Sequence, residues 1–186
     1  KNDSKRKNLT DWSILSFLLE IDNCHYPMAD SYLQYGIDGV IRIAAETLET
    51  LQNNLQSKLQ DQTQLDIAYL ESLLHVWKRF RQFIADHMVL ALESAKQETS
   101  DTKKKCYEKI AKICQNLTIN KPNTFCEALQ LFWFTYLFRS PFGAGCIGRL
   151  DQLLYPFYKH DCEMGIWDQQ EAEKMLEEMF ARMNEI

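Results

Sequence analysis

The sequence lacks the features that mark several large classes of protein. No alternation of apolar and polar residues indicates a convincing β-strand, and no internal repeat or low-complexity segment occurs in the 186 residues. The formal net charge of −5 argues against a nucleic-acid-binding surface. No apolar run is long enough for a membrane helix, and no apolar signal region opens the chain. We therefore expect a cytoplasmic, mainly α-helical protein in which residues 1–186 form a single helical region.

The short motifs of common catalytic and metal sites are also missing. There is no G-x-G-x-x-G fingerprint, no P-loop and no G-x-S-x-G turn. The four histidines form neither H-x-x-x-H nor H-E-x-x-H, so a zinc site has little support and we expect no bound metal. The six cysteines contain no C-x-x-C pair, and we interpret them as free thiols in a reducing compartment. They are Cys24, Cys106, Cys114, Cys126, Cys146 and Cys162.

What the sequence does contain is helical periodicity. Apolar residues recur at three- and four-residue steps over residues 30–59 and again over residues 65–92. A polar break at residues 61–63 separates the two patterns. Together they predict a long αα-hairpin over residues 30–98. Gly36 and Gly39 lie near its start, where the pair either lets another backbone come close or is simply tolerated.

The second half of the chain, residues 102–186, predicts several shorter helices. Thr124 and Glu127 form a T-x-x-E capping box, and the helix that follows is apolar nearly all round. Such a helix is buried on every side, so we expect part of its cover to lie outside this chain. A second capping box at Asp168 and Glu171 opens the last helix. The predicted helices are 107–117, 125–138, 152–160 and one from 168 to the end of the chain.

Cys146 is the one side chain that invites a catalytic interpretation. It lies beside glycines in a loop, and Arg149 follows three residues later. A nearby cation could lower the pKa of the thiol and make it nucleophilic. The alternative is a small buried thiol in a tight loop.

Four longer strings resemble the glycyl radical enzymes of the pyruvate formate-lyase type. Residues 125–134, FCEALQLFWF, are similar to that family's F-x-E-A-L-Q-x-x-W-F string. Residues 148–152, GRLDQ, and residues 155–158, YPFY, are similar to its G-R-x-D-Q and Y-P-x-Y strings. LQYGIDGVIRI, residues 33–43, is similar to a family helix that begins Y-G-I-D. The match is collinear, and Asp86-His87 in place of the family's Arg-Tyr pair leaves the subfamily open.

The resemblance implies that this chain is a helical fragment of a ten-stranded α/β barrel enzyme. In that family a glycyl radical takes a hydrogen atom from a cysteine, and the resulting thiyl radical attacks the substrate. The outcome is cleavage of a C–C, C–O, C–N or C–S bond, or acyl transfer. The implied partners are the rest of the enzyme, a small-molecule substrate, a second copy in a full-length homodimer, and a separate S-adenosylmethionine radical activase that installs the radical. Neither nucleic acid nor a membrane is implied.

The two residues that carry the radical are not expected in this chain. In the family the thiyl cysteine lies downstream of G-R-x-D-Q, which places it beyond Ile186, and the glycyl loop R-V-x-G-Y has no counterpart here. Cys146 is therefore not the thiyl cysteine, and we expect no catalytic residue, no bound cofactor and no activity in the chain alone. Both ends look cut, because Lys1 is not Met and the last helical pattern has no cap. The alternative is a stand-alone helical scaffold or interaction module.

The resemblance also implies substrate-pocket candidates in two loops. A basic pocket residue of the family lies twelve positions before the first helix glycine, which gives Cys24, with His25 beside it. A second pocket position lies five residues before the Arg of G-R-x-D-Q, which gives Ala144, and a small residue three before that Arg gives Cys146. If the loops form a pocket, both should wall one cavity. The alternative is that they only cap helices.

Overall fold

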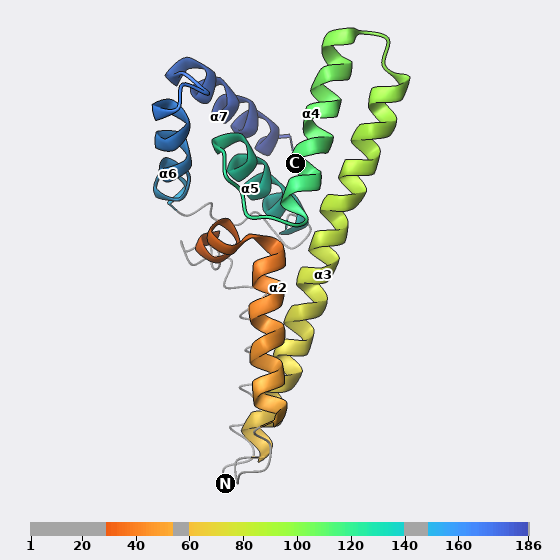
Figure 1. Ribbon diagram of the computed structural model, residues 1–186, viewed down its shortest axis with the longest axis vertical. Helices are drawn as coiled ribbons and strands as arrows, with labels where there is room; N and C mark the ends of the chain where they lie inside the picture. The colour runs from red at the N-terminus through yellow and green to blue at the C-terminus, as the bar shows by residue number, and fades with distance from the viewer. Residues whose placement is uncertain (1–28, 54–59, 140–148, 186) are drawn as a thin grey trace. The chain divides into compact units, whose positions relative to one another are not determined.

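A computed structural model of the chain describes residues 29–53, 60–139 and 149–185. These residues form helices and short connections, with no strand in any of the three described segments. The chain divides into two compact units, one formed by Asp30–Leu131 and the other containing the described residues outside that range. The helices are α2 (Ala29–Asn53), α3 (Gln60–Gln97), α4 (Asp101–Leu117), α5 (Phe125–Arg139), α6 (Leu150–Glu163) and α7 (Gln169–Met183) (Figure 1). The mainly helical class predicted from the periodicity is confirmed.

The first unit, Asp30–Leu131, is built around the long helix α3. Helix α2 lies along the first half of α3 and α4 lies along its second half (Figure 1). The rings of Tyr32 on α2 and Trp77 on α3 lie 6.3 Å apart, and Trp77 packs edge-on against Phe80 at 5.9 Å. This apolar contact holds the two helices together. Their remaining core side chains are Leu33, Ile37, Val40, Ile41, Ala44, Leu74, Ile84, Ala91 and Ala95.

Two sequence-predicted boundaries in this unit are wrong. The polar break expected at residues 61–63 lies inside the first turn of α3, which begins at Gln60. A helix N-terminus leaves its first N–H groups unpaired and favours acidic and polar residues, so a polar cluster suits a helix start as well as a loop. The expected loop between the second and third helices is also shorter, because α4 already begins at Asp101.

Gly36 interrupts α2 and admits another segment of backbone. Its φ of 74° and ψ of 169° are not helical, and they fall in a region that is open almost only to glycine. A Cβ atom at this position would lie 2.8 Å from both Cα and N of Lys121. Gly36 is therefore a site of close backbone approach, one of the two alternatives posed by the sequence. Gly39 differs, since the nearest neighbour of a Cβ there is Tyr35 Cβ in its own helix, 3.0 Å away.

Helix α5 is apolar nearly all round and has no exposed face. No residue from Phe125 to Phe138 is exposed, and Ala128, Leu131 and Phe132 are fully buried. Trp133, Tyr136, Leu137 and Phe138 remain half-buried. The expectation that part of the cover of this helix lies outside the chain stays a prediction.

The second unit includes the described residues from Phe132 onward, and α6 and α7 belong to it. Helix α6 is longer than the expected 152–160 and continues through Pro156, whose side chain is exposed. The ring removes the one N–H bond to Gln152, and on an exposed face water can hydrate the freed carbonyl. The helix ends at Glu163, and Gly165, with a φ of 66°, turns the chain away from it. Ile166 N–H donates to Asp161 O at 2.9 Å, and Gly165 N–H donates to Cys162 O at 3.1 Å. These two bonds form a Schellman cap.

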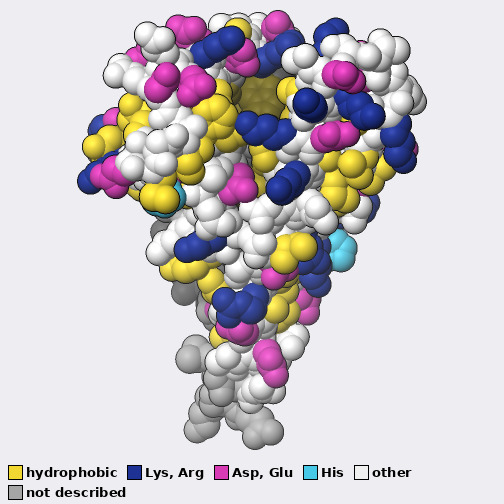
Figure 2. All heavy atoms as spheres, turned by 45° about the horizontal axis from the view of Figure 1, so that its top comes forward, with side chains coloured by type: hydrophobic (Ala, Val, Ile, Leu, Met, Phe, Trp, Pro, Cys, Tyr) yellow, Lys and Arg dark blue, Asp and Glu magenta, His cyan; other side chains and the backbone are white. Residues whose placement is uncertain are grey.

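The surface carries both signs of charge. On the face that Figure 2 shows, Lys and Arg side chains alternate with Asp and Glu side chains, and hydrophobic groups lie between them. Such a mixed distribution does not make a nucleic-acid-binding stripe on that face. Among the described helices, none combines the length and the hydropathy required to cross a bilayer.

Candidate functional site

All four sequence-predicted pocket residues, Cys24, His25, Ala144 and Cys146, lie outside the described residues. The structure describes the two helices that follow them instead. Helix α2 begins at Ala29, four residues after His25, and α6 begins at Leu150, four residues after Cys146. These helices belong to different units, so the prediction that both loops wall one cavity stays a prediction.

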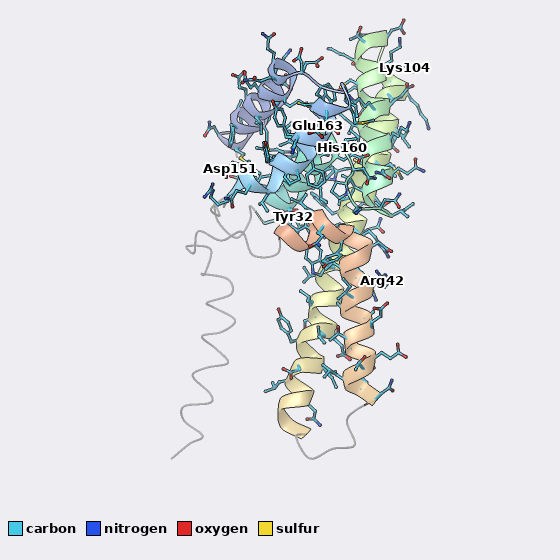
Figure 3. All side chains as sticks on the ribbon, turned by 60° about the vertical axis from the view of Figure 1, so that its left-hand side comes forward. Tyr32, Arg42, Lys104, Asp151, His160 and Glu163 are labelled. Atoms are coloured by element: carbon cyan, nitrogen blue, oxygen red, sulfur yellow. The ribbon has the colours of Figure 1, made fainter. Side chains whose placement is uncertain are left out.

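The G-R-x-D-Q string forms the start of α6. Arg149 precedes the helix and donates two hydrogen bonds to one carboxylate, from Nε to Asp151 Oδ1 at 2.9 Å and from a terminal nitrogen to Oδ2 at 2.7 Å. This forked contact lowers the pKa of Asp151 to about 2, and the same carboxylate raises the pKa of Arg149. Asp151 lies in the first turn of α6, where a negative charge is favourable. The string therefore places an exposed ion pair at the start of α6, where Figure 3 labels Asp151.

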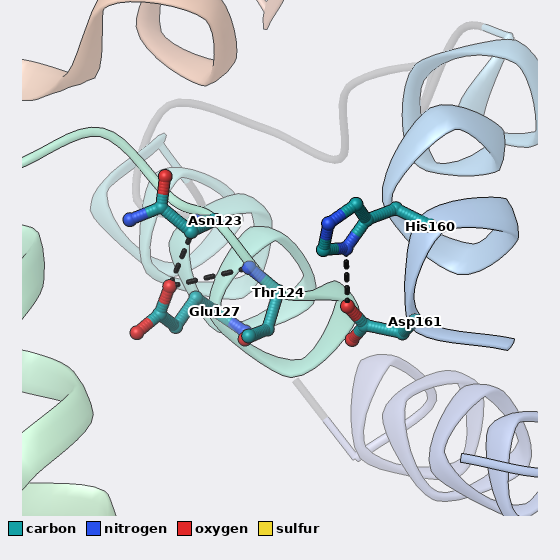
Figure 4. A network of polar contacts seen from close by, with 5 residues as sticks. All are labelled: Asn123, Thr124, Glu127, His160 and Asp161. Carbon is teal, nitrogen blue, oxygen red and sulfur yellow. Dashed lines mark hydrogen bonds and ion pairs between the residues drawn. The ribbon is translucent and has the colours of Figure 1, made fainter. Parts of the chain in front are cut away.

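The Glu of the F-x-E-A-L-Q string fixes the start of α5. Glu127 Oε2 accepts hydrogen bonds from the backbone N–H of Asn123 at 2.8 Å and of Thr124 at 3.3 Å (Figure 4). In return, the N–H of Glu127 donates to Thr124 Oγ1 at 3.2 Å, which confirms the predicted capping box. Glu127 Oε1 also accepts from the side chain of Asn116 on α4 at 2.8 Å. One carboxylate thus connects two helices and the turn between them.

Asp161, near the end of α6, is a buried carboxylate. Its side chain is 1% exposed, and Oδ1 lies 3.1 Å from Nδ1 of His160, whose own side chain is 60% exposed (Figure 4). A carboxylate near a helix C-terminus faces the negative end of the helix dipole, and its burial costs free energy unless it is paired. A protonated His160 would supply a compensating charge. Asp161 lies three residues after the end of the Y-P-x-Y string, and nothing in the sequence indicated its burial.

The first unit carries a shallow cleft of about 310 Å³, near the lower limit for a small-molecule site. At its base Arg81 donates to Asp38 Oδ1 at 2.6 Å, which ties α3 to α2. The two side chains are 40% and 47% exposed, so the pair contributes little to stability. The sequence analysis did not predict this pair, because Asp38 and Arg81 are polar residues that lie between the apolar positions of their helices. The cleft is lined by Asp38, Arg81, Gln82, Ala85, Thr118 and Ile119.

The thiols in the described part of the chain give no sign of reactivity. Cys114 on α4 is fully buried, and burial raises its pKa to about 11, so the thiol stays protonated. Cys106, Cys114, Cys126 and Cys162 are thiols outside any disulfide, as predicted. Across residues 29–53, 60–139 and 149–185, no three His, Cys, Asp or Glu side chains form a group that could hold a metal ion.

Comparison with known proteins points to one family. A family model described as pyruvate formate lyase-like matches residues 23–186. The chain is 37% identical over 98 residues to trans-4-hydroxy-L-proline dehydratase of Clostridioides difficile, which covers 50% of this chain and 12% of the dehydratase. It is 29% identical over 162 residues to the 4-hydroxyphenylacetate decarboxylase glycyl radical subunit of Clostridioides difficile. The aligned region covers 85% of this chain and 17% of that subunit.

A solved structure shows the same fold. The B12-independent glycerol dehydratase from Clostridium butyricum superimposes with a TM-score of 0.72 at 23% identity, over 85% of this chain and 20% of that one. The chain thus spans between 12% and 20% of the length of these relatives.

Proposed function

Because the chain belongs to the pyruvate formate lyase-like family, we propose that it is a helical portion of a glycyl radical lyase. The match of the family model over residues 23–186 carries the proposal. The relatives named above are a dehydratase and a decarboxylase, so we favour a lyase that acts on a small polar molecule over acyl transfer. The parent would have the ten-stranded α/β barrel of the family, and we place it in the cytoplasm as a homodimer.

We propose that this portion is inactive by itself. The family's chemistry requires a glycyl radical, installed by an S-adenosylmethionine radical activase, and a cysteine that relays it to the substrate. Neither R-V-x-G-Y nor a G-C-x-E string occurs in the sequence. Without these residues the chain can neither hold nor relay a radical. The contribution of the described helices is structural, through the ion-paired start of α6 and the capped start of α5.

In the assembled enzyme, the loops before α2 and α6 would contribute to the substrate pocket. Cys24 and His25 are the candidates in the first loop, with His25 able to bear a positive charge. Ala144 and Cys146 are the candidates in the second, where small side chains leave room for a compact substrate. The ion pair of Arg149 with Asp151 is consistent with this role, because Arg149 follows the loop directly and the pair lies at the start of α6.

The inactivity is tested by anaerobic incubation of the chain with a radical activase and S-adenosylmethionine. We expect no glycyl doublet in the electron paramagnetic resonance spectrum, whereas a full-length relative treated in parallel should give one. A doublet from this chain would contradict the proposal. The lyase assignment is tested by reading the gene downstream of Ile186. Codons for G-C-x-E and R-V-x-G-Y would support it, and a stop codon would favour a helical scaffold.

The role of His25 is tested in the full-length enzyme. We expect His25→Ala to raise KM at least tenfold with a smaller change in kcat, because a lost binding contact acts on the bound ground state as well as the transition state. His75→Ala, on the exposed surface of α3, is the matched control and should leave both constants unchanged. An unchanged KM for His25→Ala would remove this residue from the pocket.

A further inference from the structure

The turn between α4 and α5, residues 118–124, lies against α2 at the break in that helix (Figure 1). A Cβ atom on Gly36 would lie 2.8 Å from Cα and N of Lys121 and 3.0 Å from the carbonyl carbon of Asn120. All three atoms belong to the backbone, and the side chain of Lys121 is exposed. The turn therefore meets α2 through its main chain, at the residue of α2 whose backbone is not helical.

A backbone contact of this kind depends closely on where the turn lies. The attraction between two packed atoms falls by a quarter to a half when they separate by about 0.5–1 Å, and a closer approach makes them clash. Lys121 precedes Pro122, which confines the backbone of Lys121 to extended conformations, and the side chain of Pro122 is fully buried. These restraints fix the shape of the tip of the turn. The position of the tip depends on what holds the residues on either side of it.

Glu127 holds the residues on both sides of the tip. Its Oε2 accepts the N–H of Asn123 at 2.8 Å and that of Thr124 at 3.3 Å, on the C-terminal side. Its Oε1 accepts a hydrogen bond from the side chain of Asn116 at 2.8 Å. The Oδ1 of Asn116 in turn accepts from the side chain of Asn120 at 2.8 Å, on the N-terminal side. The two residues of the tip thus lie between segments that one carboxylate connects.

We propose that Glu127 is a positioning residue for the contact between Gly36 and Lys121, so that the carboxylate and the glycine act as one unit that fixes the turn to α2. Gly36 supplies the space that the turn enters, and Glu127 holds the turn where it can enter. Two of the family strings, residues 33–43 and 125–134, thereby share one structural role. The inference is independent of the proposed radical chemistry, because it rests only on contacts within the first unit.

The first test is hydrogen exchange in the intact chain, measured residue by residue by NMR. In Glu127→Ala, the amides of residues 41–44 on α2 should exchange about tenfold faster or more, although none of the hydrogen bonds described above joins Glu127 to α2. These amides are the first that can bond to a helix carbonyl beyond the break at Gly36. Their acceleration should exceed that of amides around Ala95 by at least about threefold, which separates a local release of α2 from a loss of overall stability.

Glu171→Ala is the matched control. Glu171 has the same position in the capping box of α7 and accepts the N–H of Asp168 at 3.1 Å. Its loss should leave exchange in residues 41–44 unchanged. Glu127→Gln, which keeps an acceptor oxygen at the same reach, should restore most of the protection. Equal acceleration of residues 41–44 by Glu127→Ala and Glu171→Ala, or none by Glu127→Ala, would overturn the proposal.

A double-mutant cycle between Glu127 and Gly36 measures the coupling directly. In the Gly36→Ala background the new Cβ atom has already displaced the turn, so Glu127→Ala should shift the urea midpoint by roughly half as much as in the unmodified chain, or less. Equal shifts in the two backgrounds would show that the two residues act independently and would refute the proposal. If the Gly36→Ala chain does not fold, the exchange measurement on Glu127→Ala decides the question alone.

Discussion

Replacement of Gly36 by alanine should strongly destabilise the first unit of the chain. Two costs add at this position. The backbone, at φ 74° and ψ 169°, lies in a region that costs a non-glycine residue on the order of 1–3 kcal/mol. The new Cβ would also lie 2.8 Å from Cα and N of Lys121, and forced overpacking costs typically about 1–3 kcal/mol. Because the neighbour is backbone, it cannot rotate away, and we expect a total of about 4 kcal/mol.

The assay is urea unfolding followed by circular dichroism, combined with hydrogen exchange to locate the loss. We expect faster exchange in α2 and in the turn at residues 118–124, which meet at Gly36. Gly165→Ala is the matched control. Gly165 also has a positive φ, of 66°, but a Cβ there would meet nothing within 4 Å. It should cost only the backbone term, roughly 1–2 kcal/mol. If Gly36→Ala cost no more than Gly165→Ala, the close approach of Lys121 would be refuted.

Three further predictions follow from the sites described above. Glu127→Ala should lower the free energy of unfolding by about 2 kcal/mol, measured in urea, because the carboxylate accepts three hydrogen bonds. Glu127→Gln keeps part of that network and should cost less. Equal losses for the two variants would show that the carboxylate charge alone matters. The Asp151 carboxyl should titrate near pH 2 by NMR, so its contribution to stability is present above about pH 4 and is lost as the pH falls through about 2. Arg149→Met should return the titration midpoint of Asp151 to the ordinary range of a carboxyl group. An unchanged midpoint would contradict the forked pair. Cys114 should resist alkylation at pH 8 while the exposed Cys106 reacts, and equally fast alkylation of the two would contradict the burial of Cys114. The free energy of unfolding should fall as the pH rises from about 9 to about 11, because the folded state holds the Cys114 proton more tightly than the unfolded state does.

Local features of the fold were predictable from the sequence because their causes lie within a few residues. The capping boxes at Thr124–Glu127 and Asp168–Glu171 were both predicted, and both form reciprocal hydrogen bonds. The all-round apolar composition of residues 125–138 likewise predicted a helix without an exposed face. The family could also be predicted from the sequence, because family membership depends on strings of residues rather than on where those residues lie in the fold.

The candidate site was predictable only in part. The strings F-x-E-A-L-Q and G-R-x-D-Q were identified from the sequence, but the hydrogen bonds and ion pairs that their charged residues form were not. That Glu127 also binds Asn116 on another helix follows from packing, because eleven residues separate them. The burial of Asp161 could not be read from its polar neighbours, since the sequence does not say which side of α6 is covered.

Sequence by itself determined the helical class and the capped starts of α5 and α7, which follow from short-range patterns of apolar and polar residues. It also indicated the family, through the resemblance of longer strings such as F-x-E-A-L-Q and G-R-x-D-Q. Tertiary structure alone decided that Gly36, and not Gly39, lies against the backbone of another segment of the chain. Gly36 and Lys121 are 85 positions apart, and only the folding of the turn after α4 onto α2 brings them together. It also decided the Asp38–Arg81 pair, because 43 positions separate the two residues and only the packing of α2 on α3 brings their side chains within hydrogen-bond distance.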